Sequence, residues 1–366
     1  MPLPPANTDQ PAAIHGRGAA VQPDNPYLQT QRVDDWEHVA DDQEYLDSLG
    51  RPPTEYFDDE SQTIVATNDS PDIGFNYSVN PYRGCAHGCS YCYARPGHEY
   101  LGLSAGLDFE TKIMVKRRAP ELFRAFLARP QWRPETIMFS GVTDCFQPIE
   151  RELRLTRGCL EVAAECRQPV AIITKNALIT RDAPVLQELA VHGAAHVAFS
   201  VTTLDRDLAR AMEPRTSTPE ARLRAIAELS AAGIPTMVMI GPVIPGLNDS
   251  EIPNILKAAQ QAGATRASYV LLRLPSTVRE VFLDWLRRER PNHAAKVESF
   301  IRSTRGGQLS SSKWGDRHRG KGIIAEQIEQ TFRVFAKRHE LDREWPPLNA
   351  YAFRPPKPTS GQLSLF

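Results

Sequence analysis

Three cysteines lie within eight residues of this chain, in the order Cys85-Ala-His-Gly-Cys89-Ser-Tyr-Cys92, with the spacing C-x3-C-x2-C. Thiolates this close together can converge on one iron–sulfur cluster, and a four-iron cluster needs four ligands. No fourth cysteine stands nearby, so one iron would stay open to a ligand that is not protein. The pattern indicates a cluster that performs chemistry on a bound ligand, more than one that only carries electrons.

Two other cysteine sites compete with this interpretation. A ferredoxin would show C-x2-C-x2-C-x3-C followed by proline, which is absent here. A structural zinc site takes four ligands, usually as two separated pairs, and His87 would be cramped as a fourth ligand between Cys85 and Cys89. Three buried free thiols are a third interpretation, which glycine-flanked cysteines at this density disfavour. Cys159 and Cys166, seven residues apart on an expected helix, are predicted simply to pack in the core.

The chain has 366 residues, of which 41% are hydrophobic, enough for a substantial core. It has no apolar run long enough to span a bilayer, and its first residues lack the basic-then-apolar pattern of a secretory signal. We therefore expect no membrane association and a cytoplasmic location, where thiols stay reduced and a cluster can be assembled.

The net charge of −1 hides an asymmetry along the chain. Residues 34–60 carry eleven acids against the single base Arg51, and residues 61–366 carry a net +9. A basic body of this kind can bind a polyanion such as DNA. Ordinary solvated faces explain any single basic cluster at least as well.

Four segments are expected along the chain. Residues 1–70 are acidic and proline-rich and predict a partly disordered extension, whereas short apolar runs alternate with amphipathic helical stretches over residues 71–275. Residues 276–345 predict a helical region, and residues 346–366 a flexible proline-rich tail. The expected strands are 75–79, 136–142, 169–175, 196–202, 235–241 and 267–273. This alternation predicts an α/β fold with parallel strands and right-handed crossovers.

The cysteine loop also carries a family resemblance. C-x3-C-x-aromatic-C, with Tyr91 in the aromatic position, resembles the signature of the radical S-adenosylmethionine (SAM) superfamily. The resemblance implies a partial (βα)6 TIM-like barrel and two cofactors, a [4Fe–4S] cluster on the three cysteines and SAM chelated by the open iron. It also implies that an electron from the cluster cleaves SAM to a 5′-deoxyadenosyl radical, with Tyr91 near the cofactor.

Polar side chains at the strand ends are the candidates for holding SAM, because ligands gather at the carboxyl ends of such strands. Thr143 and Asp144 follow the second strand and suit the ammonium group of SAM, and Lys175 at the end of the third strand suits its carboxylate. Ser200, at the end of the fourth strand, and Glu213, which comes after it, are candidate partners of the ribose hydroxyls. A structural salt bridge explains Glu213 equally well.

Longer motifs over about residues 70–275, among them GVTDCFQPIE and GPVIPGLND, resemble the subgroup related to spore photoproduct lyase, which repairs a thymine lesion in DNA by radical chemistry. In that lyase a cysteine near the end of the second strand returns a hydrogen atom to the product. Gly141 falls close to that position here, which separates this chain from the lyase itself. Cys145 lies four residues further on, and we consider it a candidate hydrogen-atom donor, with a small apolar filler as the equal alternative.

Two functions follow from these motifs. The first is a radical SAM enzyme acting on an unknown substrate, with DNA repair or modification the best guess, which would need an electron donor such as flavodoxin or ferredoxin. The alternative is a nucleic-acid- or clamp-binding module whose iron–sulfur cluster is structural or senses redox state. An enzyme should lose SAM cleavage on Cys92→Ala, whereas a zinc domain would contain zinc and no iron.

The last five residues, Gln362, Leu363, Ser364, Leu365 and Phe366, resemble the pentapeptide by which bacterial polymerases and repair proteins bind the sliding clamp. The preceding proline-rich segment would present two leucines and a phenylalanine with no local core to bury them. A tail folded back on its own body is the alternative. We expect the bacterial sliding clamp as a partner.

Overall fold

The computed structural model describes residues 14, 16–28, 52–311, 313, 315–345 and 347–357. Its centre is a seven-stranded sheet whose spatial order follows the chain. The strands, from one edge to the other, are β2 (Val65–Thr67), β3 (Tyr77–Val79), β6 (Ile137–Phe139), β7 (Val170–Thr174), β8 (Ala195–Ser200), β9 (Thr236–Val243) and β10 (Arg266–Leu271). The last six run parallel, and only β2 is antiparallel to its neighbour.

Each of the six expected strands is confirmed, as is the α/β class with a largely parallel sheet. The sheet is open, with β2 and β10 as its edges, so the strands do not close into a barrel. Strand β7 shows why the sequence predicts the strands well. Its residues VAIIT alternate between fully and partly buried positions, as the two-residue repeat of a strand requires.

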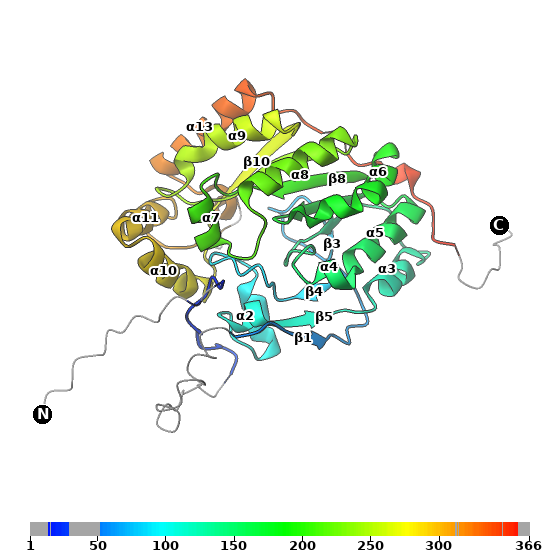
Figure 1. Ribbon diagram of the computed structural model, residues 1–366, viewed down its shortest axis with the longest axis horizontal. Helices are drawn as coiled ribbons and strands as arrows, with labels where there is room; N and C mark the ends of the chain where they lie inside the picture. The colour runs from blue at the N-terminus through cyan, green and yellow to red at the C-terminus, as the bar shows by residue number, and fades with distance from the viewer. Residues whose placement is uncertain are drawn as a thin grey trace, which may run out of the picture.

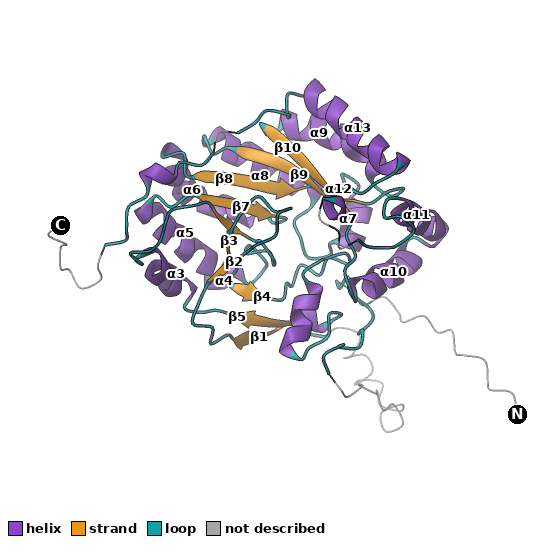
Figure 2. Cartoon of the chain, turned by 180° about the vertical axis from the view of Figure 1, so that it is seen from behind, coloured by secondary structure: helices purple, strands orange, loops and turns teal. Residues whose placement is uncertain are grey.

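Helices connect the parallel strands and cover the sheet (Figures 1 and 2). They are α3 (Ala119–Leu127), α4 (Glu150–Leu153), α5 (Leu155–Cys166), α6 (Ala183–Val191), α7 (Arg206–Met212), α8 (Pro219–Ala231) and α9 (Ile252–Gln261). Local signals fix their starts. Thr218 accepts a hydrogen bond from the amide of Ala221, and Pro219 occupies the first position of α8. The core between helices and sheet is aliphatic and aromatic, with Phe139 of β6 and Phe123 of α3 in edge-to-face contact.

The expected helical region follows β10 as α10 (Val278–Glu289), α11 (Pro291–Ser303), α12 (Asp316–Arg319) and α13 (Ile323–Arg338). A second apolar core joins this region to the cysteine loop, because Phe282 and Trp285 of α10 pack in one cluster with Cys89 and Tyr91. The C-terminal helices therefore close one side of the loop. No helix in the described part of the chain is both long and apolar enough to cross a membrane.

A second, three-stranded sheet was not foreseen. It contains β1 (Glu55–Asp58), β5 (Lys112–Val115) and β4 (Tyr82–Arg83), with β5 in the middle. Its strands have two to four residues, and β1 is exposed throughout, so neither length nor hydrophobic alternation marks them in the sequence. Between β4 and β5 lie the cysteine loop, the 3₁₀ helix η1 (Arg95–Leu101) and the short helix α2 (Asp108–Thr111).

Both expected terminal extensions are partly described. Residues 16–28 run beside α2 (dark blue in Figure 1), and Arg17, Gly18 and Ala19 are buried there. Residues 347–357 are irregular apart from η4 (Ala350–Ala352), and the amide of Arg354 donates a 2.9 Å hydrogen bond to the carbonyl of Cys166. Residues 1–13, 15 and 29–51 of the N-terminal extension, and the clamp-like pentapeptide 362–366, lie outside the described residues.

Candidate active site

The cysteine loop makes successive tight turns between β4 and η1. The amide of Gly88 donates to the carbonyl of Cys85, and the amide of Cys92 donates to that of Cys89, both at 3.2 Å. Gly88 has φ +66°, a left-handed conformation that glycine adopts without strain. The Arg95 guanidinium, itself fully buried, donates to the carbonyl of Cys89 at 2.8 and 3.1 Å. These bonds hold the three thiols on one compact loop.

The donor set suits a multi-iron cluster. Burial, followed by the charge of Glu213, raises the pKa of Cys89 well above its usual range. Burial and the charge of Cys85 raise the pKa of Cys92 to about 11. Thiols must be deprotonated to bind a metal, and three thiolates on one short loop repel one another. Cationic iron would offset that repulsion. The hydroxyl of Ser90 is buried without a hydrogen-bond partner among the described residues, which leaves it as a donor for cluster sulfur.

Within the described residues, no three histidine, cysteine or acidic side chains are grouped as ligands of a single metal ion. His87, the fourth ligand of the alternative zinc site, is within hydrogen-bond range of Cys85, and its ring also has partners outside the cysteine loop. Its Nδ1 lies 3.4 Å from a carboxylate oxygen of Asp144, and its Nε2 lies 3.3 Å from the amide nitrogen of Asn176. Both ring nitrogens are therefore directed at the ends of the second and third parallel strands.

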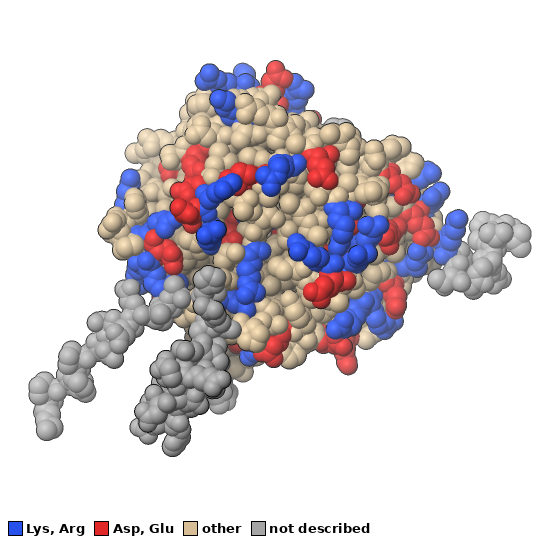
Figure 3. All heavy atoms as spheres, viewed as in Figure 1, with Lys and Arg blue, Asp and Glu red and all other residues tan. Residues whose placement is uncertain are grey.

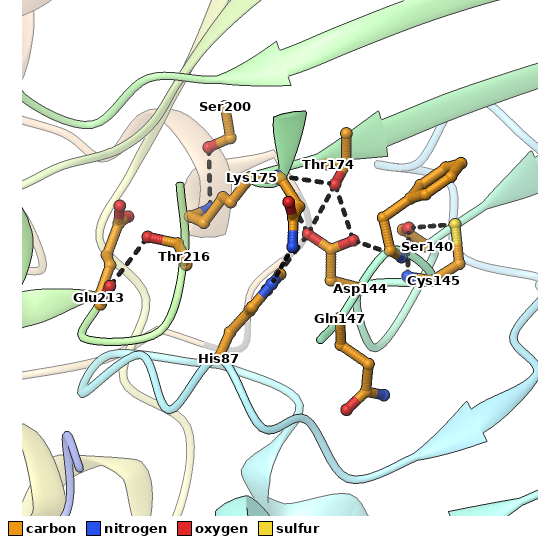
Figure 4. A network of polar contacts seen from close by, with 12 residues as sticks. His87, Ser140, Asp144, Cys145, Gln147, Thr174, Lys175, Ser200, Glu213 and Thr216 are labelled. Atoms are coloured by element: carbon orange, nitrogen blue, oxygen red, sulfur yellow. Dashed lines mark hydrogen bonds and ion pairs between the residues drawn. The ribbon is translucent and has the colours of Figure 1, made fainter. Parts of the chain in front are cut away.

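Asp144 is the hub of a network that joins these strand ends to the loop (Figure 4). Its carboxylate accepts hydrogen bonds from the hydroxyl of Thr174 at 2.8 Å and from the amides of Lys175 and Phe146 at 2.8 and 2.9 Å. Burial would raise the pKa of Asp144, but His87 and the backbone donors outweigh burial and hold the pKa below its usual range. Asp144 is thus committed to protein partners, and its expected contact with the ammonium group of SAM stays a prediction.

Lys175 extends from the end of β7 toward β8 and β9. Its ammonium group donates a 2.8 Å hydrogen bond to the hydroxyl of Ser200 and a 3.3 Å hydrogen bond to the carbonyl of Gly241. It also lies 5.8 Å from the centre of the Tyr91 ring, within range of a cation–π contact. The positive charge therefore stands beside the cysteine loop, where it lowers the pKa of Cys89 against the effect of burial. Among the expected SAM contacts, Lys175 and Ser200 are brought together directly.

Glu213 holds the side chain of Tyr91 in place through a hydrogen bond. It accepts hydrogen bonds from the Tyr91 hydroxyl and from the Thr202 hydroxyl, and it forms a buried ion pair with Arg222 of α8. Arg222 and Lys175 hold the pKa of Glu213 below its usual range, although burial opposes them. The salt bridge that the sequence left as the equal alternative is present. A ribose contact by Glu213 stays a prediction, because both carboxylate oxygens already have partners.

Thr143 and Cys145 lie deeper than the sequence led us to expect. The hydroxyl of Thr143 donates a 2.8 Å hydrogen bond to the carbonyl of Tyr82, and this bond connects the segment after β6 to β4. Cys145 is fully buried in the main core, and its sulfur accepts a 3.0 Å hydrogen bond from Ser140. In Figure 4 Cys145 lies beyond Asp144 as seen from Lys175. This position favours the alternative of a packing role, and hydrogen-atom donation by Cys145 stays a prediction.

The position expected to correspond to the lyase's cysteine has no room for that side chain. A Cβ added to Gly141 would lie 2.9 Å from the Cβ of Ser78, closer than side-chain carbons approach in folded proteins. The side chain of Ser78 therefore occupies the space that a cysteine at residue 141 would need. The departure from the lyase pattern therefore involves the neighbouring strand β3 as well, because Ser78 belongs to that strand.

Sequence reasoning missed two supports of the loop. Gln147 is fully buried. Its side chain accepts a 3.0 Å hydrogen bond from the amide of Ala86 and donates a 3.2 Å hydrogen bond to the carbonyl of Gly84. Glu110 of α2 is also fully buried and pairs with Arg95, the residue that holds the Cys89 carbonyl. A glutamine in the motif GVTDCFQPIE was visible, but nothing in the sequence indicated its partners.

The N-terminal strap, which we define as residues 16–28, packs directly on the cysteine loop. The amides of Gly18 and Ala19 donate to the two carboxylate oxygens of Glu110 at 3.1 and 2.9 Å. A Cβ on Gly18 would lie only 1.9 Å from the carbonyl oxygen of Gly88, so only glycine fits. Because Gly88 lies between the first two cysteines, the strap covers the loop from the outside.

A loop of three thiols beside a parallel sheet, facing a lysine at the carboxyl edge of its strands, defines an iron–sulfur site of the kind that binds a second cofactor. The chain belongs to the radical SAM superfamily, whose family profile matches residues 79–259. A [4Fe–4S] cluster and SAM are therefore its cofactors, and the residues described above fit both. Cys85, Cys89 and Cys92 would hold the cluster, with Lys175 and Ser200 beside it.

Two relatives in sequence are uncharacterised proteins. An uncharacterised protein of Mycobacterium tuberculosis is 39% identical over 232 residues, which are 63% of this chain and 68% of the relative. An uncharacterised protein of Methanocaldococcus jannaschii is 29% identical over 178 residues, 49% of this chain and 64% of that protein. Among solved structures, spore photoproduct lyase with a dinucleoside spore photoproduct has a TM-score of 0.53 at 15% identity over 78% of each chain. That likeness shows a shared fold.

Proposed function

We propose that this protein reductively cleaves SAM and uses the 5′-deoxyadenosyl radical to abstract a hydrogen atom from a substrate. The observation that carries the proposal is the position of the Lys175 ammonium, 2.8 Å from Ser200 and in cation–π range of Tyr91. When bound, the reduced cluster supplies one electron that breaks the sulfur–C5′ bond of SAM, which releases methionine and the radical.

The chain's own residues bind and orient the cofactors. Lys175 carries the charge that a SAM carboxylate needs as it approaches the open iron, and Ser200 fixes the direction of the lysine. Glu213 accepts a hydrogen bond from the Tyr91 hydroxyl and so fixes the orientation of the ring that contacts Lys175. The strap and α10 cover the loop, which excludes water from a reactive radical.

DNA is the substrate class that we consider first. The fold likeness to spore photoproduct lyase and the net +9 of residues 61–366 support this choice. The face shown in Figure 3 carries lysine and arginine interspersed with acids, so charge over that whole face is a weak guide to the substrate. Gly141 and the side chain of Ser78 beside it lead us to propose a reaction other than that of the lyase, because the hydrogen-atom donor of the lyase is missing.

Anaerobic reconstitution tests the proposal. Reduced protein with a four-iron cluster should convert SAM to 5′-deoxyadenosine, and Cys92→Ala should abolish the conversion. The alternative function, a binding module with a structural or redox-sensing cluster, gains if the cluster assembles and cycles between redox states while SAM stays intact. Physiological reduction would come from a flavodoxin or ferredoxin, in the cytoplasm.

A sliding clamp is the partner that we propose for the C-terminal pentapeptide. The last described residue, Lys357, donates a 3.1 Å backbone hydrogen bond to Glu165 of α5, on the helical cover of the sheet and not at the cysteine loop. The position of Lys357 on α5 is the observation that favours a clamp site separate from the cysteine loop. Deleting these five residues should abolish binding to purified clamp without changing SAM cleavage. Unchanged clamp binding by the truncated protein would remove the pentapeptide as the docking site, and no clamp binding by the full-length protein at micromolar concentrations would remove the partner.

A further inference from the structure

Three arginines gather at the carboxyl end of β10, on the same edge of the sheet as the cysteine loop. Arg305, which follows α11, donates to the carbonyl of Leu272 at 2.8 Å and to the carbonyl of Asp316 at 2.5 Å. These two carbonyl groups directly precede Arg273 and Arg317 in the chain. Arg305 therefore ties the other two arginines to one place, although they are 44 positions apart in the sequence.

Negative charge at this place is scarce. Arg317 forms a 2.8 Å ion pair with Asp72, and the side chain of Asp316 is paired with Lys321 at 2.8 Å. Arg273 has no ion pair with a described carboxylate, and its buried Nε has no hydrogen-bond partner in the described part of the chain. The Nε of Arg305 is likewise buried without a hydrogen-bond partner among the residues that the structure describes.

Burial adds to this excess of positive charge. Burial and the charge of Arg273 lower the pKa of Arg305 to about 10, and burial and Arg317 lower the pKa of Arg273. Burial and the charges of the same three arginines also lower the pKa of His318, although Asp72 opposes them. Like charges held together in a partly buried place cost free energy, which a bound anion would offset.

An exposed aromatic residue joins this cluster to the active site. Arg273 lies within electrostatic range of Tyr93, which directly follows the third cysteine of the loop. The Tyr93 hydroxyl donates a 2.9 Å hydrogen bond to the carbonyl of Gly141. The side chain of Tyr93 is nevertheless 51% exposed, and Val142, next to Gly141, is 48% exposed. Proteins that bind single-stranded nucleic acid combine an exposed aromatic ring, on which a base stacks, with a cation that pairs with the phosphate. Tyr93 is half exposed and within electrostatic range of Arg273, so the two residues could supply these two groups.

We propose that Arg273, backed by Arg305 and Arg317, binds a backbone phosphate of a nucleic acid substrate, with an adjacent base placed on Tyr93 beside the cluster. This inference rests on the proposed function and deepens it, because it names a phosphodiester as the group that the active site recognises. Fork-shaped arginine donors match phosphate oxygens in pairs, which a lysine does not reproduce.

The test is binding of a fluorescein-labelled single-stranded DNA 12-mer to anaerobically reconstituted protein, followed by anisotropy at several salt concentrations. Arg273→Gln should weaken binding about tenfold and reduce the salt slope by about 0.7, as expected for one lost phosphate contact. Arg273→Lys should recover only part of the affinity. Arg333→Gln on α13 is the matched control, because it removes the same charge from an exposed arginine elsewhere.

Equal losses for Arg273→Gln and Arg333→Gln would overturn the inference, and so would the absence of DNA binding by the parent protein. Thymidine monophosphate that binds as tightly as the 12-mer would also overturn it, in favour of a small phosphorylated substrate. SAM cleavage without added substrate is measured in the same preparations, and the control Arg333→Gln should leave it unchanged. Cleavage without DNA binding therefore removes this inference alone, whereas failure of cleavage in the parent removes the proposed function.

Discussion

The contact between the strap and the cysteine loop makes Gly18→Ala the most informative single substitution. The added Cβ would lie 1.9 Å from the carbonyl oxygen of Gly88 and 3.0 Å from the amide nitrogen of Ser90. Since non-bonded carbon atoms approach to about 3.5 Å, the strap must withdraw by more than about 1 Å. That movement breaks the hydrogen bonds of 3.1 and 2.9 Å from Gly18 and Ala19 to Glu110.

Hydrogen bonds to a charged group contribute about 1.5–3 kcal/mol each, so docking of the strap should weaken by about 3–6 kcal/mol. The undocked population should then rise at least a hundredfold, at about 1.4 kcal/mol per tenfold change. Arg17, only 6% exposed in the docked strap, becomes accessible when the strap leaves. We therefore expect trypsin to cut after Arg17 at least a hundred times faster, as measured by mass spectrometry of timed digests.

Gly97→Ala is the control for this experiment, because a Cβ at that exposed glycine of η1 meets nothing within 4 Å. The control should be digested at the parent rate. We also expect the Gly18→Ala cluster to bleach faster in air, since the strap covers the loop. Digestion of Gly18→Ala at the parent rate would refute the tight docking of the strap.

Three further predictions concern single side chains. Gln147→Leu should lower the iron content of reconstituted protein severalfold by removing both side-chain hydrogen bonds to the loop backbone, and parent-level iron would contradict this role. Cys145→Ala should leave SAM cleavage unchanged and lower the melting temperature by a few degrees through the cavity that it leaves in the core, whereas a changed product once a substrate is known would restore its proposed chemistry. Burial and Arg266 lower the pKa of His196 to about 4, so the unfolded state gains a proton first and stability should fall as the pH drops from about 6.5 toward 4. Chemical denaturation of His196→Gln should show less of that decline.

The sequence predicts the parallel sheet well because its strands are buried apolar runs that end in polar residues. The small sheet escapes prediction because β4 has only two residues and β1 exposes all four of its residues. These strands are held by pairing with β5, whose residues 112–115 are separated in the sequence from both of them.

The site divides along similar lines. Three cysteines in eight residues reveal themselves by spacing, and the position of Lys175 follows from its place at a strand end. The burial of Arg17 and Gly18 depends on Glu110, more than 90 residues away, so a strap with no hydrophobic periodicity resembles an unstructured extension. The commitment of Asp144 to His87 and Thr174 likewise depends on tertiary contacts that the motif alone does not show.

The central claim is that the cysteine loop and Lys175 together make SAM cleavable. The most direct measurement is the amount of 5′-deoxyadenosine formed per protein after anaerobic reconstitution, reduction with dithionite and addition of SAM. We expect product from the parent protein, none from Cys92→Ala, and at least tenfold less from Lys175→Met at a SAM concentration that saturates the parent. A parent protein that contains four irons, binds SAM and forms no 5′-deoxyadenosine would contradict the account.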